Sequence, residues 1–150
     1  MIVRLALVND IPRMMAIRNG VNENKLTNPL RFSIGDYSLF LSSPCRSWVV
    51  SQDDYIIGFC SIDLPNNNVW ALFVDPAFEG KGAARLLFQT ALFWYFNQTK
   101  ATLWLSTEPG TRAEQFYLAF GFSAVGITSS GEQRFEMSYS AWNDRYGIGN

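Results

Sequence analysis

Apolar positions in this chain form short continuous runs and longer helical stretches, separated by polar turns. The run at 69–74 is too short for a helix and is rich in β-branched and aromatic residues, so it predicts a buried strand that Pro76 ends. The stretch at 83–96 predicts a buried helix, because Arg85 interrupts it and it falls well short of the roughly 20 apolar residues that a membrane span requires. Its aromatic residues exceed the needs of one helix face, which raises the hypothesis of a homodimer contact.

Similar patterns divide the rest of the chain into strands and helices. Further strands are predicted at 2–7, 48–51, 55–63, 101–106, 122–127 and 132–139, and further helices at 10–19, 36–42 and 111–120. The tail at 140–150 carries no clear pattern. Strands come first and then alternate with helices, without repeats or low-complexity linkers. We therefore predict an α+β fold in which helices cover both faces of a mixed, mostly antiparallel sheet.

Composition and charge predict one globular domain over residues 1–150. With 150 residues, 48% of them hydrophobic and 17% charged, the chain can bury about two-thirds of its unfolded surface around one core. The net charge of −1 offers no attraction to nucleic acid or to an anionic membrane, so we expect neither as a partner. The apolar run at 1–7 is broken by Arg4, which argues against a signal peptide and for a cytoplasmic protein.

The sequence contains no histidine and two separate cysteines, Cys45 and Cys60. The absence of histidine excludes a Ser/His or Cys/His catalytic system. Two cysteines without a C-x-x-C spacing cannot complete a zinc site, so we expect no metal. Both thiols fit the role of small buried hydrophobic groups in a reducing compartment.

The most distinctive segment, 75–85, joins a predicted strand to a predicted helix and contains Gly80 and Gly82. Glycine allows backbone conformations closed to other residues, and the first N–H groups of a helix have no acceptor within it, so this segment has the outline of an anion site. Lys81 adds a positive charge there. The spacing excludes a nucleotide P-loop, which ends in Gly-Lys-Ser/Thr, and a dinucleotide fingerprint, whose third glycine would stand at Arg85. Glycines that serve only the geometry of the turn are the alternative.

Within this segment, Glu79-x-x-Gly82-x-Ala84 resembles the Gln/Arg-x-x-Gly-x-Gly/Ala signature of the GNAT superfamily, the acetyl-CoA-dependent N-acetyltransferases. Residues 109–122 resemble a second signature of that family, Asn-x-x-Ala-x-x-Phe-Tyr followed by Gly-Phe, with Gly110 in place of the Asn. In the first signature, Glu79 replaces the usual Gln or Arg. The two signatures stand in the family's order and at about its separation. The resemblance implies the GNAT (acyl-CoA N-acyltransferase) fold, acetyl-CoA as co-substrate and a primary amine as acceptor.

The resemblance also implies roles for individual residues. The loop would hold the coenzyme A diphosphate, and the preceding strand would pair its backbone with the pantetheine arm. Tyr117 would sit beside the coenzyme sulfur, and the amine would attack the thioester directly, without an acyl-enzyme intermediate. The implied coenzyme-binding residues are Leu72, Phe73, Val74, Glu79, Gly80, Lys81, Gly82, Ala83, Ala84, Arg85 and Tyr117.

The residues around Tyr117 predict a short helix in their own right. Thr111 and Glu114 have the spacing of a capping box, and Gly121 stands where a left-handed C-cap belongs. Tyr117 falls on the core-facing side of that helix, where a packed ring with a bonded hydroxyl is the alternative to a catalytic role. A free phenol has a pKa near 10 and a free thiol one near 8.5, so proton transfer to the thiolate is uphill by about 2 kcal/mol. Hydrogen bonding to the sulfur is therefore the favoured role.

A general base for the amine is harder to identify. The candidates are Asp63 near the end of a strand, Glu108 just after another, and Glu23 in the first long loop; each is more simply explained as a solvated carboxylate. Glu136 alternates with apolar neighbours and either faces the site or pairs with Arg134. Three functions therefore remain open: an N-acetyltransferase, a non-catalytic acyl-CoA-binding module, and a scaffold whose loop binds no phosphate.

Overall fold

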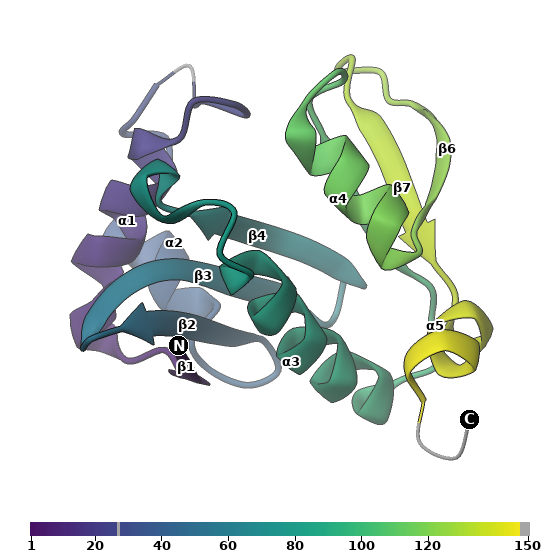
Figure 1. The fold of residues 1–150 in the computed structure, drawn as a ribbon, viewed down its shortest axis with the longest axis horizontal. Coiled ribbons are helices and arrows are strands. Elements are labelled where there is room, and N and C mark those ends of the chain that lie inside the picture. Colours follow the sequence, from purple (N-terminus) through teal and green to yellow (C-terminus); the bar gives the residue numbers. More distant parts are fainter. Residues whose placement is uncertain (27, 148–150) are drawn as a thin grey trace. The chain divides into compact units, whose positions relative to one another are not determined.

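The computed structural model describes residues 1–26 and 28–147. The chain divides into two compact units, Met1–Tyr95 and Phe96–Asn150. Each unit combines antiparallel strands with helices (Figure 1), which confirms the predicted α+β class. The expectation of one domain over 1–150 stays a prediction, because a division into compact units does not distinguish one domain from two. Among the described residues, none of the helices has the length and apolar character needed to cross a bilayer.

The first unit is built on four antiparallel strands that follow one another in the sheet as they do in sequence. They are β1 (Ile2–Leu5), β2 (Arg46–Gln52), β3 (Tyr55–Asp63) and β4 (Asn68–Val74). At the end of the β2–β3 hairpin, Gln52 pairs with Tyr55. The two residues between them, Asp53 and Asp54, have φ angles of 52° and 64°, as in a type I′ turn. Asp tolerates this left-handed region, so the turn is determined locally.

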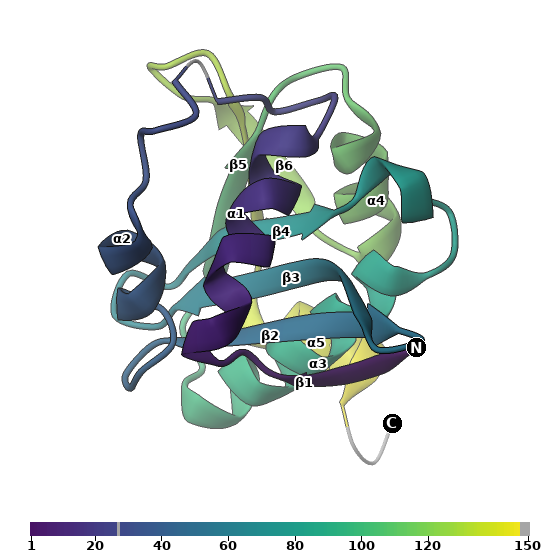
Figure 2. The ribbon, with the colours of Figure 1, turned by 90° about the vertical axis from the view of Figure 1, so that its left-hand side faces the viewer.

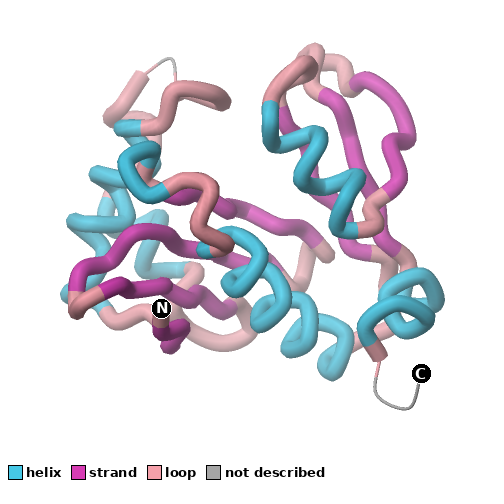
Figure 3. Tube along the Cα trace, in the orientation of Figure 1, coloured by secondary structure: helices cyan, strands magenta, loops and turns pink. Residues whose placement is uncertain are grey.

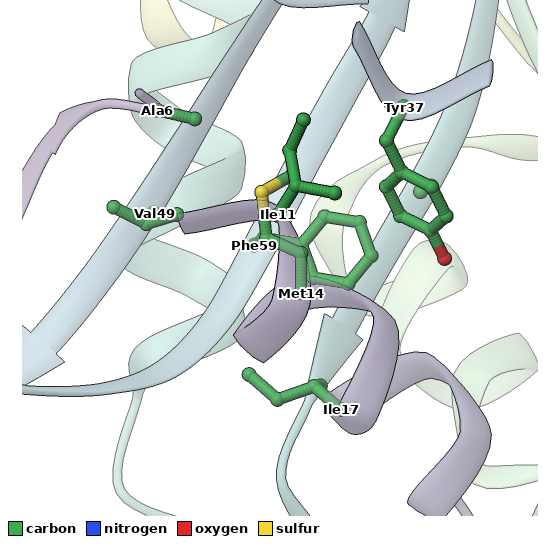
Figure 4. Packing of buried hydrophobic residues seen from close by; sticks show 8 residues of the cluster. Ala6, Ile11, Met14, Ile17, Tyr37, Val49 and Phe59 are labelled. Atoms are coloured by element: carbon green, nitrogen blue, oxygen red, sulfur yellow. The ribbon is translucent and has the colours of Figure 1, made fainter. Parts of the chain in front are cut away.

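Helices cover both faces of this four-stranded sheet (Figure 2). On one face lie α1 (Ile11–Gly20), which follows the 3-10 turn η1 (Val8–Asp10), and α2 (Ile34–Leu39); α3 (Ala83–Gln98) lies on the other. Because successive strand residues point to opposite faces, Val49 joins the α1 side, whereas the ring of Trp48 meets that of Trp94 in α3 edge to face at 5.5 Å. The core on the α1 side (Figure 4) consists of Ala6, Ile11, Met14, Ile17, Tyr37, Val49, Phe59 and Ala71.

β4 contains a β-bulge at Trp70. The register between β3 and β4 shifts there, and the pairing passes directly from Val69 to Ala71. The Trp70 ring stacks on that of Phe40 at 4.1 Å between centroids. It also meets the rings of Phe32 and Tyr37 edge to face at 5.3 and 5.2 Å, so the bulge ties α2 and the segment before it to β4.

The second unit has three antiparallel strands and two helices. The strands are β5 (Leu103–Thr107), β6 (Ser123–Ile127) and β7 (Gln133–Met137), and β7 lies in the middle. The helix α4 (Arg112–Phe120) packs alongside β6 and β7 (Figure 1), and α5 (Tyr139–Tyr146) follows β7. The buried side chains of the strands and α4 are Leu103, Leu105, Tyr117, Phe120, Phe122, Phe135 and Met137.

Several predicted boundaries are wrong by two or three residues. The first strand ends at Leu5 because the chain turns into η1 ahead of α1. The second helix begins at Ile34 and ends at Leu39, before the predicted 42. Its start is set by a capping box, in which Ser33 Oγ accepts the Asp36 N–H at 3.2 Å and the Asp36 carboxylate accepts the Ser33 N–H at 2.7 Å.

The tail contains a helix that the apolar pattern did not predict. In α5, Ser138 Oγ accepts the Ala141 N–H at 3.1 Å, and the Trp142 ring stacks on that of Phe96 at 5.1 Å. Because Trp142 is the buried side chain of this helix, the sequence has no apolar residues repeated at helical spacing there. The Ser138 cap was the available signal. Residues 148–150 of the predicted tail lie outside the described residues.

Candidate functional site

The segment between β4 and α3 is a loop with one short helical turn (Figure 3). The turn η2 (Pro76–Phe78) follows β4, and Gly80 and Gly82 then have φ angles of 76° and 88°. This left-handed region costs residues other than glycine roughly 1–2 kcal/mol. A Cβ at either position would meet no described atom within 4 Å, so the backbone conformation rather than space requires glycine. The predicted turn with two specialised glycines is confirmed.

The loop presents a row of backbone N–H groups. Within the described part of the chain, the N–H groups of residues 80–84 have no acceptor. The hydrogen-bond ladder of α3 begins with Leu86, whose N–H donates to the carbonyl oxygen of Gly82 at 3.1 Å. Free donors at the beginning of a helix of 16 residues are the basis of an anion site.

Charged side chains near this row favour an anion. Lys81 is exposed, and its Nζ lies 5.4 Å from the centre of the Phe78 ring. Arg85 adds a second cation in the first turn of α3, which carries no acidic residue, while Glu79 is one carboxylate against these two. The helix macrodipole contributes about 0.3–1 kcal/mol in the same direction. This donor set fits a phosphate or a diphosphate.

Asp75 fixes the start of the loop. Its N–H donates to the Ile57 carbonyl oxygen at 2.8 Å, its Oδ1 accepts the Ala77 N–H at 3.0 Å, and its Oδ2 accepts Nη2 of Arg13 at 2.6 Å. Burial raises the pKa of this carboxyl, but the hydrogen bonds from Arg13 and Ala77 and the charge of Arg13 outweigh it and leave the pKa below its ordinary value. Sequence reasoning missed this anchor, for which an Asp directly before the proline of a turn was the available signal.

Leu72, Phe73 and Val74 lie in the last part of β4 and are half-buried. The Phe73 ring packs against that of Phe59 at 5.9 Å, and the guanidinium of Arg18 lies 4.2 Å from the Phe73 centroid. The three residues run directly into the anchored loop. The strand and the loop predicted to hold the coenzyme therefore form one continuous segment, and the binding role itself stays a prediction.

Tyr117 lies in the second unit, on the inner face of α4. Its side chain is 7% exposed, and its ring packs against those of Phe122 and Phe135 at 5.9 and 5.8 Å. The buried face predicted for this helix is confirmed, as is its left-handed C-cap at Gly121. The structure thus accounts for the ring by packing, and the role of the hydroxyl in catalysis stays a prediction.

The capping box predicted at the start of α4 is wrong. Thr111 occupies the N-cap position, but its side chain makes no cap hydrogen bond. Its Oγ1 instead donates to the Glu108 carbonyl oxygen at 2.9 Å, and the Glu114 carboxylate accepts the N–H of Gly110 at 2.7 Å. Thr111 and Glu114 have the spacing of a capping box, but both side chains form hydrogen bonds with the backbone of the preceding turn instead.

Asp63 forms the turn between β3 and β4. Its carboxylate accepts the side-chain amide of Asn66 at 2.9 Å, and the Cys45 sulfur lies 3.9 Å from it. It pairs with Asn68, at the opposite end of β4 from Val74, and the six strand steps between those two residues span roughly 20 Å. These contacts account for Asp63 as a turn residue, and its role as a base stays a prediction.

The other carboxylates considered for proton transfer are dispersed. Glu108 is exposed directly after β5, and Glu23 lies in the loop after α1. Glu136 accepts Nε of Arg134 at 3.0 Å, and that guanidinium lies 4.3 Å from the Trp104 ring centroid. The structure therefore brings Glu136 into an ion pair, one of its two predicted arrangements. Among the described residues, no three acidic or cysteine side chains gather into a group that would hold a metal ion.

Solved structures of known proteins share this fold. An N-acetyltransferase from Staphylococcus aureus Mu50 matches with a TM-score of 0.78 and 17% identity over 92% of this chain and 98% of that one. The ribosomal-protein-S18-alanine N-acetyltransferase of Escherichia coli matches with a TM-score of 0.71 and 18% identity, over 91% and 90%. The PaiA N-acetyltransferase of Thermoplasma acidophilum, solved in complex with coenzyme A, matches with a TM-score of 0.75 and 14% identity, over 93% and 100%.

The sequence itself matches a family model. Residues 13–122, well over half of the chain, match the model described as "Acetyltransferase (GNAT) family". The matched range includes both signatures on which the resemblance rests, and the solved structures above are acetyltransferases of the same fold. The chain therefore belongs to the GNAT acetyltransferase family.

Proposed function

We propose that this protein transfers the acetyl group of acetyl-CoA to a primary amine. The single observation that carries the proposal is the row of N–H groups at residues 80–84, presented at the beginning of α3 and flanked by Lys81 and Arg85. A diphosphate would accept hydrogen bonds from this row, and the backbone of Leu72, Phe73 and Val74 would pair with the pantetheine arm. Acetyl-CoA supplies an activated thioester, so the protein has to bind it, exclude water and orient the amine.

Direct attack by the amine is the mechanism that these residues favour. Burial raises the pKa of the Cys60 thiol, and burial together with the nearby Asp63 carboxylate raises that of Cys45. A thiol with a raised pKa is a poor nucleophile at neutral pH, because the thiolate is the reactive form. With no histidine in the sequence to activate either thiol, an acetyl-enzyme has no good site on which to form.

Tyr117 is the residue that we assign to the departing sulfur. Its position in the second signature supports the assignment, and its hydroxyl would stabilise the thiolate by a hydrogen bond rather than by full proton transfer, which is uphill by about 2 kcal/mol for unperturbed groups. The amine must also lose a proton, and Asp63 and Glu108 remain the candidate bases, acting directly or through water.

The acceptor is proposed as a primary amine of a small molecule or of a protein. Structural neighbours bear names that cover both classes, a ribosomal-protein-alanine N-acetyltransferase from Brucella melitensis and a spermidine N-acetyltransferase chimera. A non-catalytic acyl-CoA-binding module is the alternative. Glu79 and Gly110, which replace usual signature residues, are the observations that favour it.

Two measurements test the proposal. Calorimetric titration with acetyl-CoA should show saturable binding, and release of free thiol on addition of an amine panel should show turnover. Saturable binding without thiol release from any amine would favour the non-catalytic module. Absence of binding at millimolar acetyl-CoA would remove both readings.

A further inference from the structure

We propose that Arg13 and Asp75 form a positioning pair that holds the diphosphate-binding loop in its binding conformation. This inference rests on the proposed function. It adds that affinity for acetyl-CoA depends on an arginine of α1, 62 residues away in sequence and outside both signatures.

Arg13 is held in one orientation by three contacts. Its Nη2 donates to Asp75 Oδ2 at 2.6 Å, its Nε donates to the Ile56 carbonyl oxygen at 2.9 Å, and its guanidinium lies 4.4 Å from the centroid of the Tyr55 ring. The side chains of Arg13 and Asp75 are 25% and 21% exposed, so the pair is largely withdrawn from water. A charge-assisted hydrogen bond whose two partners are fixed in this way is stronger than an ordinary ion pair on the surface.

Asp75 passes this constraint into the loop. The oxygen that Arg13 leaves unused accepts the Ala77 N–H, and the Asp75 carbonyl oxygen accepts the Phe78 N–H at 2.8 Å, so the pair fixes the whole of η2. The Phe78 ring in turn lies 5.9 Å from that of Tyr55 and 5.4 Å from Nζ of Lys81. Arg13 thus lies over the Tyr55 ring and Lys81 over the Phe78 ring, and the two rings contact each other at a tilt of 49°.

The two glycines of the loop lie in open surroundings. Residues 79–82 are exposed, and no described atom lies within 4 Å of the Cβ positions of Gly80 and Gly82. Glycine in an open loop gains the most freedom when a restraint is removed. The direction of the N–H row at these glycines is therefore sensitive to the restraints on either side of them, and Asp75 is the restraint on the β4 side.

The test is a double-mutant cycle read in acetyl-CoA binding. Arg13→Gln, Asp75→Asn and the double variant are titrated by calorimetry, and steady-state kinetics follow with a reactive amine. We expect each single variant to raise the Kd for acetyl-CoA by about tenfold and the double variant to raise it no further, since all three remove the same interaction. The KM for acetyl-CoA should rise in parallel, while kcat and the KM for the amine stay within twofold.

Arg4→Gln is the matched control. Arg4 forms an ion pair of similar length with Asp10, 2.7 Å, in the same unit, and its hydrogen bonds within the described part of the chain go to Leu5 and Asp10 rather than to the loop. This variant should leave the Kd for acetyl-CoA unchanged. If Arg13→Gln does not fold, Arg13→Lys keeps the charge but makes fewer directed bonds, and an intermediate rise in Kd is expected.

Three results would overturn the inference. Unchanged Kd in Arg13→Gln or in a folded Arg13→Lys would show that the loop needs no such anchor. A rise in Kd equal to that of Arg4→Gln, or a fall in kcat matching the rise in KM, would show that the pair serves general stability. Failure of the wild-type protein to bind acetyl-CoA is a separate outcome, which removes the proposed function and with it the ligand of this pair.

Discussion

Replacement of Gly82 by alanine isolates the contribution of the loop conformation to the binding of acetyl-CoA. Gly82 has a φ of 88°, and an added Cβ would meet no described atom within 4 Å. The substitution therefore introduces no steric clash, only the cost of the left-handed conformation, roughly 1–2 kcal/mol. If the loop keeps its conformation, stability falls by that amount; if it relaxes, the N–H row turns away from the ligand and binding weakens.

The chain offers a closely matched control in Gly131. This glycine lies in the turn between β6 and β7, has a φ of 87°, and also has no described atom within 4 Å of its Cβ position. Gly131→Ala should therefore carry the same backbone cost without touching the loop. Urea unfolding measures the stability of both variants, and calorimetric titration measures their Kd for acetyl-CoA.

The expected result is a difference between the two readouts. Gly131→Ala should lower the free energy of unfolding by about 1–2 kcal/mol and leave the Kd unchanged. Gly82→Ala should lose less stability than Gly131→Ala, because the open loop can relax out of the left-handed conformation. The relaxed loop should bind acetyl-CoA more weakly, by up to roughly 5–30-fold, because binding must restore that conformation. If Gly82→Ala loses clearly less stability than Gly131→Ala and still binds acetyl-CoA as tightly as wild type, the loop has relaxed without loss of binding, and the N–H row does not hold the ligand.

Three further predictions use other parts of the structure. Tyr117→Phe keeps the packed ring and should lower kcat in the thiol-release assay while the Kd for acetyl-CoA stays within twofold; full turnover would remove the assignment. The hydrogen bond from Arg4, with that from the Leu7 N–H, keeps the pKa of Asp10 below its ordinary value against the effect of burial. The ionised Asp10 carboxylate therefore stabilises the fold above the unfolded carboxyl pKa of about 4, and this stabilisation is lost as the pH falls below that value. The difference in urea midpoint between Asp10→Asn and wild type should be largest at neutral pH and should become smaller below about pH 4. Cys45→Ser should retain turnover, and rapid-quench mass spectrometry of the wild type should find no acetylated cysteine; its accumulation would contradict direct attack.

Local sequence determined the features that could be predicted best. The bounds of β3, the loop between β4 and α3 and the glycine cap of α4 all follow from residues within a few positions of each other. The length of an apolar run, Pro76 and the glycines at which the backbone has φ above zero mark these bounds and turns directly in the sequence. The same locality explains the GNAT resemblance, since the first signature is a turn together with the beginning of α3, and the second is α4 with the turns at its two ends.

Features that depend on distant residues were missed. Arg13 meets Asp75 across 62 residues, and neither periodicity nor spacing connects them. At the bulge, the Trp70 ring packs against three aromatic rings of the 32–40 segment, and a continuous apolar run cannot reveal such distant contacts. Competition between nearby N–H donors explains the wrong capping box, because the Glu114 carboxylate has the required spacing but accepts the N–H of Gly110 instead.

Glu79 in place of the usual Gln or Arg is compatible with the binding of acetyl-CoA because of how the loop supplies its hydrogen bonds. The donors are main-chain N–H groups of residues 80–84, and their direction is set by the φ angles of Gly80 and Gly82 and by the beginning of α3, not by the side chain at 79. Glu79 is exposed, so water and salt screen its charge within about 8 Å at physiological ionic strength. A carboxylate in that position would weaken attraction to a diphosphate modestly, while Lys81 and Arg85 oppose it. The backbone of this loop, more than the identity of its first signature residue, is therefore the feature on which an acyl-CoA site depends.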